Sequence, residues 1–465
     1  MEKLLIANRG AAAARILRAT RSLGIKTVAV YSEADRDLPY VSEADESVCI
    51  GPAAARESYL NQDVLMQTMA RCGADSLHPG YGFLSENAAF ARKVNTAGHC
   101  FIGPSPQWIE ALGNKAQARA LMQQHGLPMG SSTGVLPRSD QAVVHDAARQ
   151  LGFPVLIKPA GGGGGIGMVP VHHIEALDEA WKKAGVLAEK AFGNPALYLE
   201  RFIQAPRHIE FQFLADRYGA VVSLFERDCS TQRRYQKVIE EAPAPSIDRQ
   251  TVAAMAQRLS AILGKIGYDV IGTVEMLYTP ENGFSFLEVN TRLQVEHAIT
   301  EAVTGVDIVQ AQIRLAAGER LADVVSHTPE VNGHALEARL YAEDPVTFFP
   351  SPGLLKTFDL GPPRAGVRIE TGYVQGNRIS SHYDPMVAKI ITHAATRQAA
   401  MDEMVSVLRA VRIEGIKTNI PLILKVLESD RFRSGAMTVD GLPALMASHA
   451  KDDICASQSI AKIGA

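Results

Sequence analysis

Two kinds of hydrophobic periodicity alternate along the first part of the chain. Apolar runs of strand length at residues 4–7 and 27–31 flank an amphipathic segment of helix length at residues 11–23. A strand, a helix and a second strand in this order predict a βαβ unit. The first turn reads Asn-Arg-Gly at residues 8–10 and lacks the G-x-G-x-x-G pattern, so it predicts no dinucleotide site.

A different pattern, strict alternation on both sides of a turn, predicts a β-hairpin around Thr-Pro-Glu-Asn-Gly at residues 279–283. With a four-residue loop, Thr279 pairs with Phe284 and Glu275 faces Glu288. Like charges directly opposite each other, about 5 Å apart, destabilise a sheet unless something compensates them. The hairpin therefore predicts a cation between its two carboxylates.

Asn290 extends this predicted cation site, because alternation places it on the same face as Glu288. Oxygen ligands of this kind suit a hard divalent cation such as Mg²⁺. Two alternatives remain open: a register slipped by one residue, which would point the two acids to opposite faces, and a solvated hairpin with incidental acids.

The segment after the hairpin continues the alternation. Arg292, Gln294 and Glu296 alternate with Leu293 and Val295. A cation, an amide and a carboxylate can therefore share one side of an extended segment. This combination suits a small oxyanion and a base that acts on it.

A glycine run at residues 161–165, followed by Ile166 and Gly167, lies between two predicted strands. Backbone N–H groups of such a loop can cradle phosphates, with Lys158 as a nearby cation. The run has no G-x-x-x-x-G-K-[ST] pattern, so it is not a P-loop. A flexible linker is the alternative interpretation.

Length and composition frame these motifs. At 465 residues, 46% of them hydrophobic, the chain is long enough for about three domains of roughly 100–200 residues each. Shifts in the apolar pattern divide it into residues 1–113, 114–330 and 331–447, with a loose tail at 448–465.

Several classes of function are disfavoured. A net charge of −3 gives no polyanion-binding signature, so no nucleic-acid partner is expected. The five cysteines show no C-x-x-C spacing and indicate reduced thiols. No apolar run approaches the roughly 20 residues needed to span a bilayer, so no membrane association and a cytoplasmic location are predicted.

Seven segments, in order along nearly the whole chain, resemble motifs of the biotin carboxylase family of ATP-grasp enzymes. They are residues 5–10 (LIANRG), 78–87 (HPGYGFLSEN), Lys158 with the glycine loop, 226–230 (ERDCS), 236–238 (QKV), 240–245 (EEAPAP) and 288–297 (EVNTRLQVEH). The resemblance implies an α/β (α+β) protein: an N-terminal Rossmann-like domain, an ATP-grasp domain with a mobile lid at residues 131–203, and a C-terminal biotin carboxylase domain. It also implies an ATP-dependent ligase that converts bicarbonate to carboxyphosphate with MgATP and then carboxylates N1 of biotin.

The resemblance assigns a role to each matching position. ATP contacts fall to Lys115, Lys158, Gly163, Gly164, Gly165, Met168, Glu200, Ile203, His208 and Gln232. Mg²⁺ (or Mn²⁺) falls to Glu275, Glu288 and Asn290, and bicarbonate to Lys237, Arg292, Gln294 and the Val295 backbone. The catalytic residues are Glu296 as base with Arg292, Lys237 and Arg339. The biotin ring is bound by Tyr81, Gly82 and Arg339.

Three residues depart from the family pattern. Ala11 replaces a glutamate, Ile166 replaces a cation in the glycine loop, and Tyr235 replaces a histidine. Ala11 removes a local ion pair, Ile166 removes a side-chain phosphate contact, and the Tyr235 hydroxyl can still bond to a nucleotide. None coincides with the metal, bicarbonate or biotin residues, so an active enzyme is expected.

The resemblance also concerns partners. The chain has no Ala-Met-Lys-Met motif, so biotin is expected on a carrier protein or on a carrier domain of a longer polypeptide. Residues 382–389 (HYDPMVAK) most resemble acyl-CoA carboxylase α subunits, which favours a carboxyltransferase partner, and a homodimer is expected by analogy. Pyruvate or urea carboxylase, a different ATP-grasp ligase and a non-catalytic ATP-binding regulator are the alternatives.

Overall fold

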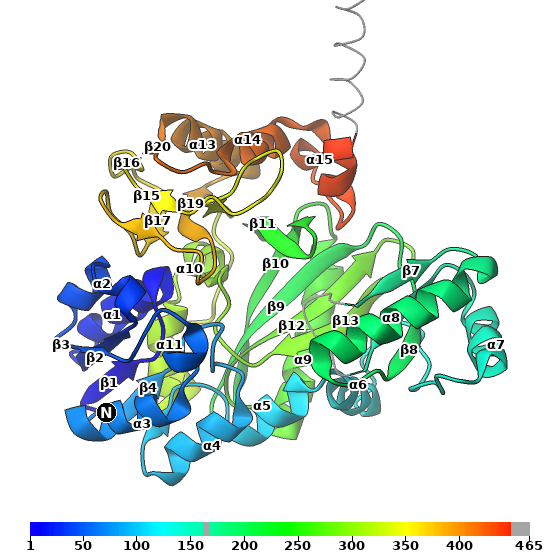
Figure 1. Ribbon diagram of the computed structural model, residues 1–465, viewed down its shortest axis with the longest axis horizontal. Coiled ribbons are helices and arrows are strands. Elements are labelled where there is room, and N and C mark those ends of the chain that lie inside the picture. The colour runs from blue at the N-terminus through cyan, green and yellow to red at the C-terminus, as the bar shows by residue number, and fades with distance from the viewer. Residues whose placement is uncertain (161–166, 448–465) are drawn as a thin grey trace, which may run out of the picture.

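The computed structural model describes residues 1–160 and 167–447, and its N-terminal part is built on a parallel sheet. The strand order is β3-β2-β1-β4-β5. The elements are β1 (Lys3–Ile6), α1 (Gly10–Ser22), β2 (Lys26–Tyr31), α2 (Pro39–Glu43), β3 (Glu46–Cys49), α3 (Gln62–Cys72), β4 (Ser76–His78), α4 (Ala88–Thr96), β5 (Cys100–Phe101) and α5 (Pro106–Gly113). The predicted βαβ unit is confirmed as β1, α1 and β2, at the lower left of Figure 1.

A small three-stranded sheet, β7-β6-β8, forms a separate lobe at the right of Figure 1. Its elements, with the helix α6 that precedes them, are α6 (Lys115–Gln124), α7 (Gln141–Leu151), β6 (Val155–Pro159), β7 (Val169–Val171), α8 (Leu177–Phe192) and β8 (Leu197–Arg201). The two strands predicted around the glycine run are β6 and β7, and they pair antiparallel. The run itself lies outside the described residues, as do the predicted ATP contacts Gly163, Gly164 and Gly165 and the departure at Ile166.

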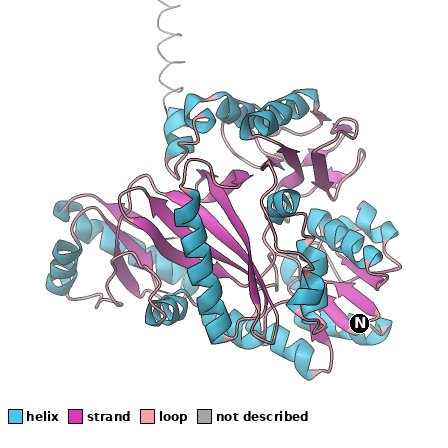
Figure 2. Ribbon diagram, turned by 180° about the vertical axis from the view of Figure 1, so that it is seen from behind, coloured by secondary structure: helices cyan, strands magenta, loops and turns pink. Residues whose placement is uncertain are grey.

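The largest sheet is antiparallel, with the order β13-β12-β9-β10-β11-β14-β19-β17. Its strands are β9 (Arg207–Ala215), β10 (Val221–Arg233), β11 (Gln236–Ala242), β12 (Val270–Thr279), β13 (Gly283–Asn290), β14 (His334–Tyr341), β17 (Val367–Thr371) and β19 (Met386–Ala394). Helix α9 (Arg249–Ile266) lies along this sheet in the view from behind (Figure 2). The sheet crosses the predicted border at residue 330 where β11 pairs with β14, and the division into three domains stays a prediction.

The remaining elements cover the C-terminal half of this sheet at the top of Figure 1 or connect it to the N-terminal part. They are α10 (His297–Thr304), α11 (Ile308–Ala316), α12 (Leu321–Val324), β15 (Gly353–Leu354), β16 (Thr357–Asp359), β18 (Arg378–Ile379), α13 (Arg397–Ala410), β20 (Arg412–Glu414), α14 (Ile420–Glu428) and α15 (Asp430–Arg433). The predicted tail at 448–465 lies outside the described residues. Among the described helices, none is both long and apolar enough to cross a bilayer.

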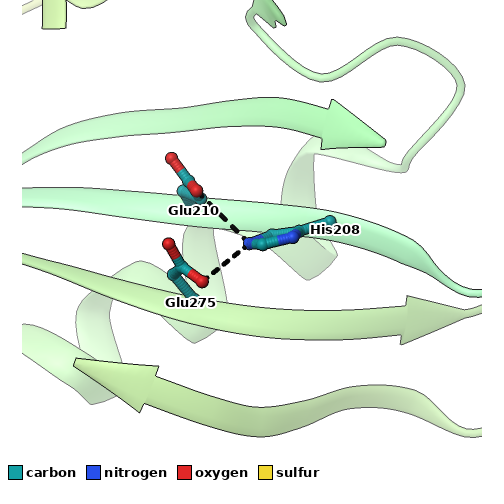
Figure 3. A group of neighbouring side chains, drawn as sticks. All are labelled: His208, Glu210 and Glu275. Atoms are coloured by element: carbon teal, nitrogen blue, oxygen red, sulfur yellow. Dashed lines mark ion pairs between the residues drawn. The ribbon is translucent and has the colours of Figure 1, made fainter. Parts of the chain in front are cut away.

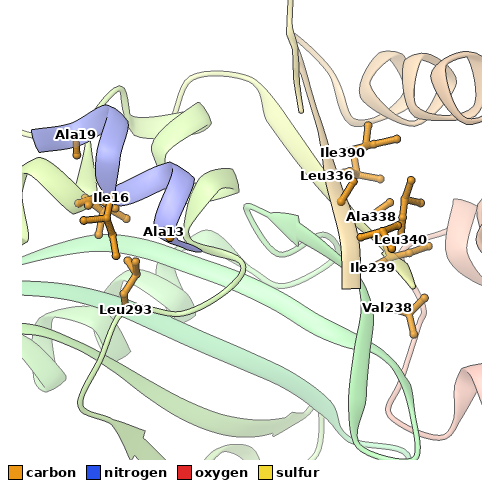
Figure 4. Close-up of a cluster of buried hydrophobic side chains, with 14 of the residues drawn as sticks. Ala13, Ile16, Ala19, Val238, Ile239, Leu293, Leu336, Ala338, Leu340 and Ile390 are labelled. Carbon is orange, nitrogen blue, oxygen red and sulfur yellow. The ribbon is translucent and has the colours of Figure 1, made fainter. Parts of the chain in front are cut away.

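Strand β14 shows how the sheet separates apolar from polar residues. Leu336, Ala338 and Leu340 are buried in one hydrophobic cluster with Ile239 and Ile390 of the neighbouring strands (Figure 4). Because alternate strand residues point to opposite faces, the residues between them project to the other side of the sheet. That second side of the sheet carries charged residues.

Candidate active site

The predicted hairpin is present as β12 and β13, and Glu275 faces Glu288 as expected. The predicted pairing nearer the turn is wrong by one residue, because Thr279 pairs with Gly283 rather than with Phe284. Gly283 adopts a φ of +67°, which allows a shorter loop. A bulge between the Met276–Phe286 and Glu275–Glu288 pairs absorbs the extra residue and restores the predicted register.

The proposed metal ligands lie together at this end of the sheet. Nδ2 of Asn290 donates to Oε1 of Glu275 at 2.8 Å, and Nη2 of Arg292 donates to Oδ1 of Asn290 at 2.9 Å. Glu288 forms a 2.6 Å ion pair with Lys115. Two carboxylates and an amide oxygen are donors that suit Mg²⁺ or Mn²⁺, so the residues present fit the predicted ion.

Lys237 joins the metal residues to the proposed base. Its Nζ donates to Glu296 at 2.7 Å and to Glu275 at 3.2 Å, and it also contacts Glu210. Burial alone would raise the pKa of Glu296, but the Lys237 and Arg339 charges hold that pKa below its usual value. Burial would likewise lower the pKa of Lys237, and its carboxylate neighbours instead raise it well above the usual value. Glu296 is therefore ionised at neutral pH and able to accept a proton.

His208 lies beside the same carboxylates (Figure 3). Its Nε2 is 3.0 Å from Glu275 and 3.2 Å from Glu210, within ion-pair distance, although neither contact has hydrogen-bond geometry among the described residues. Burial opposes the charged ring, but Glu275 and Glu210 together raise the pKa of His208 to about 10. Its Nδ1 lies 2.7 Å from Nε2 of Gln232, so two residues predicted to contact ATP are adjacent.

Other predicted ATP residues occupy the neighbouring lobe. Lys158 of β6 donates to Glu200 of β8 at 2.8 Å. Met168 precedes β7 and Ile203 follows β8, and both side chains are partly exposed. Their roles toward a nucleotide stay predictions.

Arg227 is a functional candidate that the sequence analysis left without a role. It is completely buried, contacts Oε1 of Gln294, and donates to Oε1 of Gln212 at 2.9 Å. It also donates to Oε2 of Glu210 at 3.2 Å. The sequence signal is indirect: polar residues at 208, 210 and 212 alternate with apolar ones and predict a strand with one polar face, but no local pattern shows that this face is buried against Arg227.

A cavity of about 450 Å³ opens beside Glu296, and its lining includes the residues predicted for biotin: Tyr81, Gly82 and Arg339. Ala11 and Val295 also line it. Nη2 of Arg339 donates to Glu296 at 2.9 Å, so the proposed base touches both this cavity wall and Lys237. Ala11, where the family pattern has glutamate, contributes only a methyl group to this lining.

Lysines lie beside a carboxylate and amide cation site, and a buried base lies next to a cavity. This arrangement suits an ATP-dependent ligase of the ATP-grasp class. Three family models match the chain in succession: the biotin carboxylase N-terminal domain at residues 1–109, the carbamoyl-phosphate synthase L chain ATP-binding domain at 114–324, and the biotin carboxylase C-terminal domain at 337–443. The chain belongs to the biotin carboxylase family.

Relatives agree with this placement over nearly the full length. A biotin carboxylase of Halalkalibacterium halodurans is 47% identical over 94% of this chain and 96% of its own. The α subunit of methylcrotonoyl-CoA carboxylase of Rattus norvegicus is 41% identical over 99% of this chain and 64% of its own. The 2-oxoglutarate carboxylase biotin carboxylase domain dimer of Hydrogenobacter thermophilus, solved with MgADP, ADP and bicarbonate, is 40% identical with a TM-score of 0.90, covering 96% of this chain and 98% of its own.

Proposed function

We propose that this chain uses MgATP and bicarbonate to carboxylate N1 of biotin. The observation that carries the proposal is the position of Glu296 between Lys237, which reaches the cation-site carboxylates, and Arg339, which lines the cavity. A base that touches both regions can activate bicarbonate where the phosphoryl donor and the acceptor ring meet.

In the first step, Glu296 takes the proton of bicarbonate while a bicarbonate oxygen attacks the γ-phosphorus of ATP, giving carboxyphosphate and ADP. Lys237, Arg292, Gln294 and the Val295 backbone bind the bicarbonate anion. Arg227 positions Gln294 by donating to its Oε1. This arrangement leaves the Gln294 amide nitrogen free to donate, and it now donates to Glu275 at 3.0 Å.

Phosphoryl transfer requires mainly positioning and neutralisation of charge. Lys115 and Lys158 contact the ATP phosphates, and Glu200, Ile203, His208, Gln232 and Met168 surround the adenine and ribose. Mg²⁺ held by Glu275, Glu288 and Asn290 supplies positive charge beside the phosphates. The lysines and the ion thereby offset the charge that develops on the transferred group.

In the second step, the carboxyl group moves from carboxyphosphate to N1 of biotin, and the departing phosphate carries away the N1 proton. Arg339 stabilises the enolate-like ureido oxygen, because a guanidinium remains charged and can fork onto oxygen. Tyr81 and Gly82 lie beside the biotin ring.

The wider setting is part of the same proposal. Biotin arrives on a carrier protein or carrier domain, a carboxyltransferase receives the carboxyl group in the cytoplasm, and the chain forms a homodimer. Residues 382–389 favour an acyl-CoA as final acceptor. The Hydrogenobacter thermophilus relative acts within a 2-oxoglutarate carboxylase, so other acceptors stay open.

The test is ATP hydrolysis by the purified chain with and without bicarbonate and free biotin. Hydrolysis should require bicarbonate and rise with biotin, and Arg339→Ala should remove the biotin response while the bicarbonate requirement persists. A chain that hydrolyses ATP equally well without bicarbonate, or an Arg339→Ala variant indistinguishable from the parent, would refute the proposal.

A further inference from the structure

Another pair of glutamates faces across the large sheet, besides the pairs that Glu275 forms with Glu288 and with Glu210. Glu240 of β11 and Glu337 of β14 are register partners, so their side chains leave the same face of adjacent antiparallel strands. Both residues are 0% exposed. Neither residue takes part in the proposed reaction.

The pair has fewer partners than two buried charges require. Oε1 of Glu240 accepts from Nε of Arg339 at 2.6 Å, whereas Oε2 has no hydrogen-bond donor among the described residues. Neither oxygen of Glu337 has a donor in the described chain, and the nearest cation, Nζ of Lys389, lies 3.4 Å away. An ionised carboxylate buried in this way would be strongly destabilised.

Lys389 is instead engaged elsewhere. Its Nζ lies 3.0 Å from Glu370 and donates to the backbone carbonyl of Val295. Val295 belongs to the proposed bicarbonate site and precedes the base Glu296. Lys389 therefore ties the segment carrying the base to the C-terminal half of the sheet.

Both positive and negative side chains surround the pair. Glu240 is surrounded by Arg339, Glu296 and Lys237, and burial raises its pKa to about 7 despite the two cations. Glu337 is surrounded by Lys389, Glu240, Arg339 and Glu370, and burial raises its pKa to about 8 despite its two cations. The raised pKa values agree with the carboxyl oxygens that lack a hydrogen-bond donor among the described residues.

We propose that Glu240 and Glu337 hold one proton between them, with Glu337 neutral and Glu240 ionised, and that this state positions Arg339 and Lys389. The claim about positioning rests on the proposed function, whereas the shared proton does not. Ionised Glu240 holds the guanidinium that lines the cavity. Neutral Glu337 leaves Lys389 bonded to the Val295 carbonyl, and loss of its proton draws Lys389 toward Glu337 and away from that carbonyl.

The proton is tested directly by infrared difference spectroscopy of the full chain, which detects the C=O stretch of a protonated carboxyl. The parent should show this band at pH 7 and lose it as the pH rises above 8, and Glu337→Gln should lack it. Glu241→Gln is the matched control. Glu241 is the neighbouring residue of β11, and it accepts from Arg397 at 2.6 Å. Burial opposes ionisation of Glu241, but His334 and Arg397 lower its pKa, so the control should keep the band.

Positioning is tested by the pH profile with free biotin as substrate. Glu337→Gln mimics the neutral acid, so it should retain most of the turnover and lose the alkaline decline that the pair produces. Glu240→Gln replaces the charged anchor of Arg339 with a neutral amide and should lower kcat/KM for biotin roughly 10- to 100-fold, the effect of weakening one charged hydrogen bond.

Each outcome decides one part. A parent spectrum whose protonated-carboxyl band survives Glu337→Gln overturns the shared proton, even if biotin is carboxylated. A band that behaves as expected in a chain without any biotin response retains the proton and removes the proposed function. Equal losses in the two glutamine variants with an unchanged pH profile reduce both residues to structural roles.

Discussion

Two of the glutamate pairs in direct register across the large sheet, Glu275 with Glu288 and Glu240 with Glu337, differ in what surrounds them. The Glu275 and Glu288 side chains are 6% and 26% exposed, and Lys115, Lys237 and His208 contact them. Glu240 and Glu337 are both 0% exposed and share Arg339 and Lys389 with other carboxylates. Two carboxylates that face each other across the sheet are therefore accommodated in two ways: by surrounding cations at Glu275 and Glu288, and by burial with few partners at Glu240 and Glu337.

The contrast shows that register alone does not fix the charge of a carboxylate. Lys237 and His208 hold the pKa of Glu275 well below its usual value, although burial opposes this. Glu275 is therefore ionised, and carboxylate oxygens of this kind suit a metal. At Glu240 and Glu337, burial outweighs the nearby cations and raises both pKa values, more at Glu337, so that the pair retains one proton.

The largest effect is expected at the pair of Glu275 and Glu288. Glu288→Lys places a cation where the metal charge is required and should lower MgATP turnover by about 10³-fold. The partly exposed side chain should leave folding intact, as judged by circular dichroism during thermal unfolding. Glu281→Lys, the same charge reversal at the exposed hairpin tip, should stay active. Full activity of Glu288→Lys would remove the metal site from this hairpin.

The next largest effect is expected at Lys237, the cation beside Glu275. Lys237→Met should reduce turnover by about 10²-fold and move the acid limb of the pH profile for bicarbonate to higher pH. The sign follows because the Lys237 charge lowers the pKa of Glu296 against burial. Without that charge the base takes up a proton at higher pH. Lys265→Met on the exposed end of α9 is the control, and an unmoved acid limb would separate Lys237 from the base.

At the pair of Glu240 and Glu337 we expect a smaller effect, on the free energy of unfolding. Burial raises the pKa of Glu337 from 4.5 to about 8, so the folded protein loses stability as the pH rises through this window. Glu337→Gln should remove the loss and stabilise the protein by roughly 1–3 kcal/mol above pH 8, with little difference near pH 4. Urea unfolding at the two pH values measures this, and a gain at pH 4 of the same size would point to packing instead.

The smallest effect is expected in the turn that leads into β11, the strand bearing both Lys237 and Glu240. Arg234 and Tyr235 adopt φ values of +49° and +65°, where glycine is favoured at the second position of such a hairpin. Tyr235→Gly should therefore stabilise the protein by up to about 1 kcal/mol, measured by thermal unfolding. An unchanged infrared band of the protonated carboxyl group and an unchanged pH profile of turnover would show that the glutamate pairs are independent of this backbone strain. A destabilised variant would mean that the Tyr235 side chain contributes contacts.

Local pattern was sufficient for much of the fold. The βαβ unit, the hairpin and the strands around the glycine run are confirmed, because each depends on periodicity and turn chemistry within a short window. The ordered motifs also identified the family. The residue roles transferred from it stay predictions, although the structure brings Lys237, Arg339 and Glu296 together.

The sequence by itself therefore determined the elements, the family and the facing of Glu275 and Glu288. Only the tertiary structure decided the bulge that restores this register, the support of Gln294 by Arg227, and the pairing of Glu240 with Glu337. The physical reason is that β11 and β14 are neighbours in the sheet but distant in the chain. No local period specifies which strands pair, and burial of a carboxyl group follows only from that pairing.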